Sequence, residues 1–434
     1  MTAIPETPMK PAEPAAFLRH LFDRAVAAAQ PGRHLVDYLP PPPRGRTIVV
    51  GAGKATAGMA EALEAVRGSD IIGTVAVPEG TECDCRAIEC LASSHPVPDE
   101  RSVAAAQRMR ERVTGLNADD QVIALISGGG SALLCDPIEG FSLEEKRALT
   151  GALLNSGATI REINCVRQTV SRIKGGRLAA LAAPAPVYTL LVSDVPGDDP
   201  ATIASGPTVA SPFRAGEAAA VLERYGIPVP DALRAAERDD PLPGAGELAD
   251  RCHHAIVCSP MHSLEAAAAA AREQGIAPLI LGDALEGEAA DMGTICAGIA
   301  RSVAAHGQPL APPAVLLSGG ESSVTITGTA GRGGRNTELA LSMAVSLAGH
   351  ERIHAIACDT DGIDGSERNA GARIDPTTLQ RGRTAGLDPL AYLAGHDAYT
   401  YFDAVDDLVI TGPTGTNVND FRAILIEAPD DGDA

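Results

Sequence analysis

Lysine is scarce in this sequence of 434 residues: it occurs only as Lys10, Lys54, Lys146 and Lys174, and every other basic residue is arginine. The 35 basic residues are outnumbered by 56 acidic ones, which gives a formal net charge of −21. The electric field of so large a negative charge repels polyanions. This excludes a general surface for binding nucleic acid or an anionic membrane. A phosphate or carboxylate ligand must instead be held by a few concentrated cations. Lys54 and Lys174 lie in glycine-rich stretches, where either chance or the need for a compact ammonium group explains them.

Long apolar runs and a secretion signal are also missing. No apolar run reaches the roughly 18 residues that a membrane helix needs, and the chain starts with a proline-rich and then amphipathic stretch. Nine scattered cysteines, an odd number without a signal peptide, predict reduced thiols and a cytoplasmic protein. Cys83 and Cys85 lie close to Cys90, but no second Cys/His pair at zinc spacing follows, so a structural metal is not predicted. We expect no membrane or nucleic-acid partner, and both a monomer and a homodimer remain open.

The apolar pattern predicts two medium-sized α/β domains. Short, solidly apolar runs alternate with alanine-rich helical patterns, which is typical of helices layered on a largely parallel sheet. The expected strands are 47–50, 71–77, 122–127, 187–193, 255–259, 278–281, 314–318, 324–327, 353–358, 408–411 and 423–426. The closeness of 314–318 and 324–327 predicts a mixed sheet in the second half. The polar, proline-bearing segment 238–250 is the best candidate for the domain boundary.

Glycine-rich segments follow the strands, where doubly wound sheets bind their ligands. Gly51 and Gly53 precede Lys54 at the start of a predicted helix, which indicates either an anion-binding turn or a tight strand–helix turn. The segment is not a Walker A motif. It is also not a complete dinucleotide-binding motif, because Thr56 stands at the position of the third glycine.

A second segment, Ser127–Ser131, contains three successive glycines, Gly128, Gly129 and Gly130. Packing hardly explains three glycines at a strand end, because each of them loses backbone entropy on folding. A phosphate cradle is therefore favoured over a bare turn. A nucleophile elbow is excluded because Leu133 stands where that motif needs glycine.

Two further charged residues of the first half fit an anion or metal site. Lys174 lies in a basic run that indicates either contact with the phosphates of a nucleotide or a solvated face. Asp194 follows an apolar strand, so it is expected at the ligand-binding edge of the sheet. There it could bind Mg²⁺ or take a proton from a hydroxyl group.

The second half repeats this arrangement. Gly319 and Gly320 follow a predicted strand as candidate nucleotide-binding glycines, and Glu321 adds a carboxylate at the strand end. Arg335 and Asn336 begin a predicted helix, where a substrate carboxylate could meet both a guanidinium group and the helix dipole. Helix capping is the alternative for Asn336.

The segment 359–365 resembles a calcium loop only superficially, because Ile363 replaces one of the ligands. We interpret its strand-end pair, Asp359 and Asp361, as carboxylates near a Mg²⁺–phosphate centre. The candidate metal ligands are Asp361, Asp194 and Glu321. Phosphate-binding loops, cationic foci and strand-end carboxylates in one acidic chain predict a phosphotransferase that uses a Mg²⁺-nucleotide. They do not identify its substrate.

Eight stretches of the sequence together form a characteristic pattern. They are GAGKA (51–55), SGGGSALL (127–134), INCVRQTVSRIKGGRLA (163–179), SDVPGDDPATIASGPTV (193–209), LSGGESSVTITG (317–328), GRGGRNTELAL (331–341), ACDTDGIDG (357–365) and TGPTGTNVNDF (411–421). In combination they resemble the glycerate 2-kinase family, which joins an N-terminal glycerate kinase domain to a C-terminal MOFRL domain. The stretches span almost the whole chain, and their combination is highly specific.

The resemblance implies a Rossmann-like N-terminal lobe over residues 12–240. It also implies a C-terminal lobe over residues 251–430, with a mixed-sheet MOFRL domain at about 312–427. The implied reaction is the ATP-dependent, Mg²⁺-assisted phosphorylation of D-glycerate to 2-phospho-D-glycerate. Lys54 and Arg335 correspond to the catalytic pair, and with Asn336 they are expected to bind the substrate. We expect an active-site cleft between the lobes, and we expect Lys54→Ala and Arg335→Ala to leave folding intact.

Two other functions remain open. One is an NAD(P)H-dependent hydroxypyruvate reductase. Two features argue against it: the glycine motif is incomplete at Thr56, and the glycine-rich motifs contain no histidine. The other is a non-catalytic sensor of a nucleotide or sugar acid, which would not need Lys54, Arg335 and the carboxylates together. The hydroxyl group that is phosphorylated, the metal ligands and the pathway are not determined by the residues.

Overall fold

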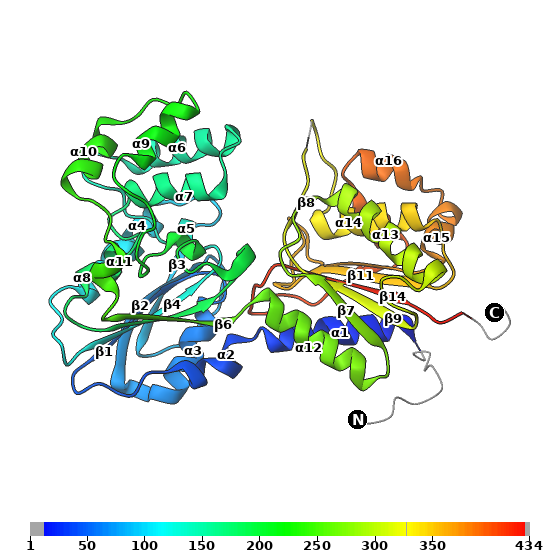
Figure 1. Cartoon of the computed structure of the whole chain (residues 1–434), viewed down its shortest axis with the longest axis horizontal. Coiled ribbons are helices and arrows are strands. Elements are labelled where there is room, and N and C mark those ends of the chain that lie inside the picture. The colour runs from blue at the N-terminus through cyan, green and yellow to red at the C-terminus, as the bar shows by residue number, and fades with distance from the viewer. Residues whose placement is uncertain (1–12, 327, 430–434) are drawn as a thin grey trace. The chain divides into compact units, whose positions relative to one another are not determined.

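The computed structural model describes residues 13–326 and 328–429, and the chain divides into two compact units (Figure 1). The parallel-sheet unit is Pro31–Cys258; the mixed-sheet unit contains the described residues up to Gln30 and from Ser259 onward. Thr327 and the outer bounds of the predicted lobes, residues 12 and 430, lie outside the described residues. None of the helices in the described ranges is both long and apolar enough to cross a bilayer.

The observed division differs in two ways from a boundary at 238–250. Strand β6 (Cys252–Cys258) pairs with β5 (Val187–Val192), so the parallel-sheet unit continues to residue 258. Helix α1 (Pro14–Ala28) belongs to the mixed-sheet unit, where Phe22 packs against Phe421 with ring centroids 5.8 Å apart. The amphipathic pattern of α1 shows that one of its faces is buried, but the pattern does not specify which sheet buries it.

The parallel-sheet unit has a six-stranded sheet in the order β3-β2-β1-β4-β5-β6, and all its pairings are parallel. The remaining strands are β1 (Thr47–Ala52), β2 (Ile71–Pro78), β3 (Ile88–Ser93) and β4 (Gln121–Ser127). The prediction of a Rossmann-like parallel sheet is confirmed. The chain reverses its direction of progress across the sheet between β1 and β4, and the carboxyl ends of strands at such a switch point form the usual ligand site.

Helices cover this sheet and form a separate layer above it (Figure 1). Those of the layer, α6 (Leu143–Asn155), α7 (Ile160–Thr169), α9 (Glu217–Arg224) and α10 (Asp231–Asp239), pack around an apolar cluster of their own. The others are α2 (Pro31–His34), α3 (Thr56–Arg67), α4 (Glu100–Val113), α5 (Gly130–Leu133), α8 (Arg177–Leu181) and α11 (Ala245–Leu248). Short 3₁₀ turns occur at Leu35–Tyr38, Gly68–Asp70, Pro196–Asp198 and Ile203–Ser205.

The mixed-sheet unit has the strand order β13-β12-β11-β14-β9-β7, with β7 and β9 parallel and the other neighbours antiparallel. The prediction of a mixed sheet is confirmed. Its strands are β7 (Ala277–Gly282), β9 (Ala314–Ser318), β11 (Ile353–Asp359), β12 (Gly371–Ile374), β13 (Leu408–Val409) and β14 (Asp420–Ile426). The prediction of a strand at 324–327 is wrong for residues 324–326, which form no strand. The strand before them, β10 (Ser322–Ser323), ends at residue 323 and pairs with β8 (Gly287–Glu288).

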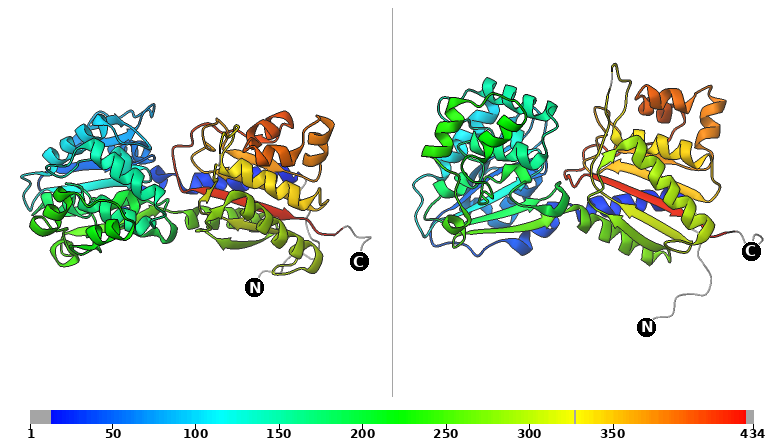
Figure 2. Two further views of the ribbon diagram at one scale, coloured as in Figure 1. Left: turned by 90° about the horizontal axis from the view of Figure 1, so that it is seen from above. Right: turned by 45° about the horizontal axis from the view of Figure 1, so that its top comes forward.

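Helices cover both faces of the mixed sheet (Figure 2). One face packs against α13 (Ala289–His306) and α14 (Arg335–Leu347), and the other packs against α1 and α12 (Pro260–Glu273). The remaining helices are α15 (Thr378–Thr384), α16 (Pro389–Ala394) and α17 (Ala398–Ala404). Because α14 begins at Arg335, the fold fixes this arginine at the N-terminus of a buried helix.

Candidate active site

Loops that follow β1, β4 and β5 meet at the switch point of the parallel-sheet unit. The backbone N–H of Lys54 donates to the carbonyl oxygen of Gly128 at 2.8 Å, and Ser127 Oγ accepts from the N–H of Ala55 at 3.0 Å. Asp194 lies against Gly128 so closely that a Cβ on this glycine would be 1.7 Å from the Asp194 Oδ2 atom. The structure thus brings Lys54, the glycine loop and Asp194 together, as the strand-end pattern predicts.

The glycine loop itself has the properties of an anion cradle. Gly129 has a φ of +79°, and the N–H groups of Gly129, Gly130 and Ser131 donate to no backbone oxygen among the described residues. Successive free N–H groups in a loop form a concave site for anions. A Cβ on Gly129 would come within 3.3 Å of Lys54 Cγ and 3.2 Å of His95 Nε2, so the missing side chain leaves room between these two residues.

Lys174 does not face the surface of this cradle. Its side chain is fully buried, and its Nζ donates to the carbonyl oxygen of Ala204 at 3.2 Å. Ala204 and the adjacent Ser205 have φ values of +52° and +60°, a left-handed conformation that is strained for residues other than glycine. The expected direct contact of Lys174 with a nucleotide therefore does not match its position behind this turn.

In the mixed-sheet unit, Arg335 is surrounded by carboxylates. Its Nε donates to Asp420 Oδ1 at 2.8 Å, its Nη2 to Asp359 Oδ2 at 2.8 Å and its Nη1 to Glu321 Oε1 at 2.6 Å. Burial opposes the charge of Arg335, but the charges of Asp420, Asp359 and Glu321 outweigh burial and raise the pKa of its guanidinium group. Three of the five N–H donors of Arg335 are thus already used.

Asp420 is the centre of this network. Its carboxylate is fully buried and also accepts from Asn336 Nδ2 at 2.8 Å, from Arg422 Nη2 at 2.6 Å and from the N–H of Ser322 at 3.1 Å. Asn336 is itself fully buried. Its side chain therefore holds Asp420, and the expectation that Asn336 contacts the substrate directly does not match its position.

The N-terminus of α14 is capped by Asp364. The carboxylate of Asp364 accepts from the N–H groups of Asn336 at 2.9 Å and Thr337 at 2.8 Å. Gly334 leaves room for it, because a Cβ there would lie 2.4 Å from Asp364 Oδ1. Burial raises the pKa of Asp364 to about 6, against the effect of these hydrogen bonds. Two of the first N–H groups of the helix are thus occupied by Asp364, which disfavours the expected contact between a substrate carboxylate and the helix dipole.

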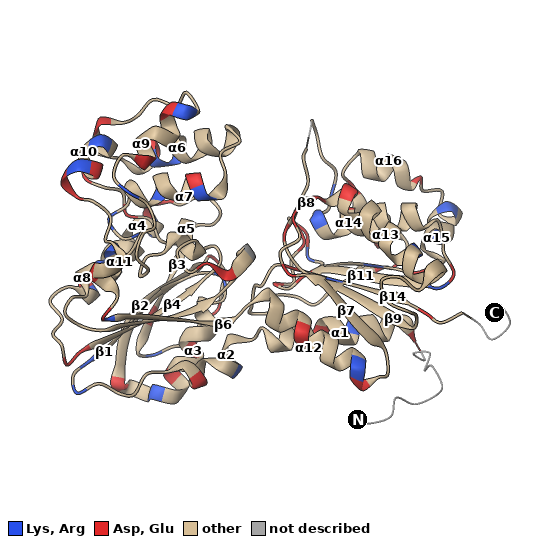
Figure 3. Ribbon diagram, viewed as in Figure 1, with Lys and Arg blue, Asp and Glu red and all other residues tan. Residues whose placement is uncertain are grey.

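The glycines and carboxylates of the second half have local structural roles. Gly320 has a φ of +107°, and a Cβ there would lie 2.3 Å from the backbone of Leu285. Asp361 Oδ1 accepts from the N–H of Ile363 at 2.9 Å, within the same turn. Acidic segments gather in the loops of the mixed-sheet unit next to β8 (Figure 3). Within the described residues, however, no three carboxylates place their oxygens within 4.8 Å of one another.

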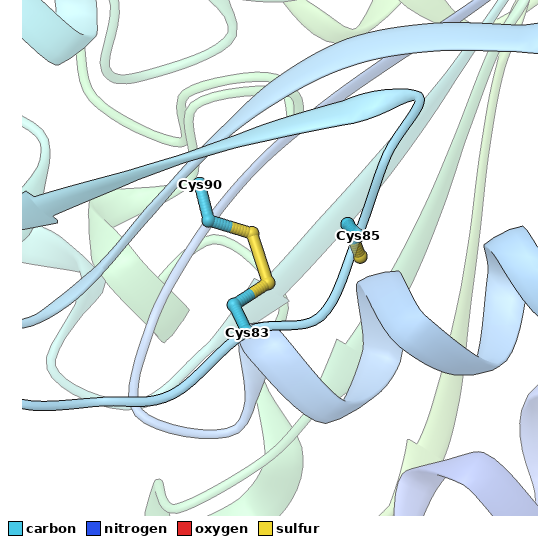
Figure 4. A group of neighbouring side chains, drawn as sticks. All are labelled: Cys83, Cys85 and Cys90. Atoms are coloured by element: carbon cyan, nitrogen blue, oxygen red, sulfur yellow. A yellow bond between two sulfur atoms is a disulfide. The ribbon is translucent and has the colours of Figure 1, made fainter.

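The cysteines give a different result from the expected reduced thiols. Cys83 and Cys90 form a disulfide, and Cys85 lies beside them (Figure 4). Burial and the charges of Glu64 and Glu61 raise the pKa of the Cys85 thiol to about 12. This thiol is therefore a poor metal ligand and a poor nucleophile at neutral pH.

Comparison with known proteins identifies the family. Residues 17–237 match the domain of unknown function DUF4147, and residues 314–420 match the MOFRL family. The chain is 40% identical to a D-glycerate 2-kinase of Thermotoga maritima over 94% of this chain and 97% of that protein. A crystal structure of glycerate kinase from the same organism matches 95% of this chain and 99% of its own, with a TM-score of 0.87 and 38% identity. The chain belongs to the glycerate kinase family.

Some relatives of this chain carry the name of a different enzyme. A protein of Agrobacterium vitis, 55% identical over 94% of each chain, is called "Putative hydroxypyruvate reductase". A dinucleotide-binding fold holds a pyrophosphate on the N–H groups that begin the first helix. In this chain the corresponding N–H groups already have acceptors. The N–H of Lys54 donates to Gly128 O, that of Ala55 to Ser127 Oγ, and that of Thr56 to Gly53 O. The geometry of this turn therefore disfavours a dinucleotide at this place.

Packing explains the two glycines that precede Lys54. A Cβ on Gly51 would lie 2.3 Å from the carbonyl oxygen of Leu125, and a Cβ on Gly53 would lie 2.0 Å from Ser127 Oγ. The alternative of a tight strand–helix turn thus accounts for both glycines without a ligand. Within the segment, only Lys54 retains a role that packing does not explain.

Sequence analysis did not identify His95 or Asp420, and it proposed Asp359 only as part of a Mg²⁺–phosphate centre, not as a partner of Arg335. His95 follows β3 and lies beside Gly129, although no histidine occurs in the glycine-rich motifs themselves. Asp359 and Asp420 stand at the end of β11 and the start of β14, which are antiparallel neighbours, and both contact Arg335. The position of each residue at a strand end was a usable signal, but the pairing of the two strands could not be inferred.

Proposed function

We propose that this protein catalyses the ATP-dependent phosphorylation of D-glycerate to 2-phospho-D-glycerate. The single observation that carries the proposal is the cradle Gly128–Ser131, with Asp194 beside Gly128 and Lys54 beside Gly129. The glycerate kinase names of the relatives support the choice of substrate. Phosphoryl transfer depends chiefly on positioning and on charge neutralisation, and this cradle offers both.

Each group of the cradle has a proposed role. The free N–H groups of Gly129, Gly130 and Ser131 bind the nucleotide phosphates, and Lys54 supplies a mobile point charge to the transferred phosphoryl group. Asp194 accepts the proton of the reacting hydroxyl group. Bound Mg²⁺ would neutralise phosphate charge, and Asp194 is the residue of this cradle with the right ligand chemistry for it. Glu321 and Asp361 remain candidate ligands by residue type alone.

The role proposed for Arg335 follows from its three carboxylate partners. Glu321, Asp359 and Asp420 would repel a substrate carboxylate, so the contact between such a carboxylate and this guanidinium group is disfavoured. We propose that Arg335 neutralises and orients these carboxylates and offers its remaining N–H groups to the substrate.

An activity assay separates the three candidate functions. The proposal predicts that ADP forms from ATP only when D-glycerate is present. Oxidation of NADH by hydroxypyruvate without any ADP formation would instead identify a reductase. Binding of a nucleotide or D-glycerate with neither reaction would identify a sensor.

The role of Asp194 can be tested by a nearly isosteric change. Asp194→Asn keeps the size of the side chain but removes the charge and the proton acceptor, so we expect kcat to fall by about 10²–10⁴-fold. The thermal midpoint should change little. A titration of activity with Mg²⁺ then tests the metal role. Unchanged Mg²⁺ dependence in the variant would remove Asp194 from the list of metal ligands.

The close approach of Asp194 to Gly128 makes this glycine a sensitive position. In Gly128→Ala, the new Cβ would overlap the carboxylate, which must move away from the cradle, so we expect kcat/KM to fall at least tenfold. Gly151→Ala is the matched control, because Gly151 lies within α6 and a Cβ there would meet no atom within 4 Å. The control should keep full activity and gain up to about 1 kcal/mol of stability. Equal activity of the two variants would contradict the assigned geometry.

A further inference from the structure

His95 lies at the same edge of the parallel sheet as the glycine cradle, but the proposed function gives it no role. It follows β3, and the carboxyl ends of parallel strands meet at one edge of a sheet, where Lys54, Gly129 and Asp194 also lie. The side chain of His95 is exposed. Its imidazole is therefore accessible to a molecule that binds at this edge.

The ring of His95 and the side chain of Lys54 flank one position beside Gly129. A Cβ on Gly129 would lie 3.1 Å from Cδ2 and 3.2 Å from Nε2 of His95, and 3.3 Å from Cγ of Lys54. The edge of the imidazole that carries Nε2 is thus turned toward the glycine. With its φ of +79°, this position would strain any other residue, whose side chain would also meet both neighbours. Glycine here keeps two nitrogen-bearing side chains next to the N–H groups of the cradle.

Hydrogen bonds hold the segment that carries His95 against the helix of the cradle. Two positions before His95, the buried Ser93 Oγ donates to the carbonyl oxygen of Leu133, the last residue of α5, at 2.9 Å. Three positions after it, the carbonyl oxygen of Pro98 accepts from Arg147 Nε at 2.6 Å. The segment is therefore anchored on both sides of the histidine. A side chain on an anchored segment loses less conformational entropy when it binds a ligand.

We propose that His95 donates a hydrogen bond from Nε2 to a phosphate oxygen of a nucleotide bound on the cradle. Asp194, which carries an acceptor, lies beside Gly128. Lys54 and His95, which carry donors, lie beside Gly129. The two successive glycines thus separate a place for a hydroxyl group from a place for a phosphate. Both the imidazolium and the neutral ring protonated at Nε2 offer this donor, and a charged acceptor strengthens the bond. The inference deepens the proposed function and rests on it for the nucleotide as the source of the phosphate.

Two substitutions of His95 with different reach test this contact. The amide nitrogen of glutamine extends about as far from the backbone as Nε2, whereas that of asparagine extends only as far as Nδ1. Isothermal titration with ATP and Mg²⁺ should show at least about tenfold weaker binding in His95→Asn. His95→Gln should stay within about threefold of wild type. The kcat/KM for ATP should follow these affinities, and the thermal midpoints should not change, because the side chain is exposed.

His254→Asn is the matched control. His254 is an exposed histidine of the same unit, in the middle of β6, and its loss should leave ATP affinity and turnover unchanged.

The outcomes separate this inference from the proposed function. ATP binding as tight in His95→Asn as in wild type would overturn the inference, even if the protein phosphorylates D-glycerate. Equal weakening in His95→Asn and His95→Gln would also overturn it, because the loss would then not depend on a donor at the reach of Nε2. Weak binding in His95→Asn alone would support it, even if wild type forms no phosphoglycerate and the proposed acceptor is wrong. A wild-type protein that binds no ATP would overturn both.

Discussion

Lys54→Ala is expected to lower kcat/KM for D-glycerate by roughly two to three orders of magnitude while the protein melts within about 1 °C of wild type. Removing one preorganised charge at the transferring group costs on the order of 3–4 kcal/mol of transition-state stabilisation. The backbone hydrogen bond from Lys54 to Gly128 does not involve the side chain, so it survives the substitution. The turn at the start of α3 therefore keeps its geometry.

The control for this prediction is an exposed cation of the same unit. Arg108, on α4, pairs with Glu89 at 3.2 Å near the surface, and Arg108→Ala should keep both activity and stability. Steady-state kinetics and thermal unfolding of the two variants decide the matter. Substantial turnover by a folded Lys54→Ala protein would show that the active site has been assigned wrongly.

Arg335→Ala is expected to lose both activity and stability, in contrast to the expectation from the sequence that this residue is dispensable for folding. Without the arginine, Asp420 and Asp359 lose a direct ion-pair partner in a buried environment. Breaking buried pairs in this way costs about 3–5 kcal/mol, which corresponds to a fall of roughly 10 °C in the melting temperature of a unit of this size.

The pH dependence of the Arg335→Ala variant provides a second signature. Burial and the charge of Asp361 raise the pKa of Asp359 well above its usual value even in wild type, where Arg335 opposes the shift. Without Arg335 this pKa rises further. A carboxyl group with a raised folded-state pKa stabilises the fold below the pKa of the unfolded chain, about 3.9, and this contribution is lost as the pH rises. Wild type shares this loss until the pH passes its own raised pKa of Asp359, so the deficit relative to wild type should be small near pH 4 and grow only above that raised pKa.

Arg301→Ala is the control for the mixed-sheet unit, because Arg301 is exposed on α13 and donates to a single carbonyl group, that of Ser346. Thermal unfolding at several pH values compares it with Arg335→Ala. An Arg335→Ala protein that melts like wild type at every pH would contradict the role given to the carboxylate network.

The parallel sheet was predictable because most of its strands are buried on both faces and read as continuous apolar runs, as β4 and β1 do. Strand β3 was missed because it is an edge strand in which only the two end residues are buried, and because it contains Glu89. The cradle and Lys54 could be found because strand-end glycines are a local signal. They lie next to each other because β1 and β4 are neighbours in the sheet.

The network around Arg335 could not be predicted in the same way. Asp364 caps α14 from 28 positions further along the chain, and Asp420 reaches Arg335 across 85 positions. Such contacts depend on the pairing of β11, β14 and β9, which the apolar pattern does not specify. The Nζ of Lys146, unpartnered among the described residues, is likewise visible only in three dimensions.

The central claim is that this protein transfers a phosphoryl group from ATP to the C2 hydroxyl of D-glycerate. Proton-coupled phosphorus NMR of a mixture of wild-type protein, ATP, Mg²⁺ and D-glycerate tests it most directly. The account predicts a new phosphomonoester resonance split into a doublet by the single proton on C2, and it predicts that Lys54→Ala gives almost none. A triplet, produced by the two protons on C3, would contradict the assigned hydroxyl group. No new phosphomonoester, together with NADH-dependent reduction of hydroxypyruvate, would contradict the function itself.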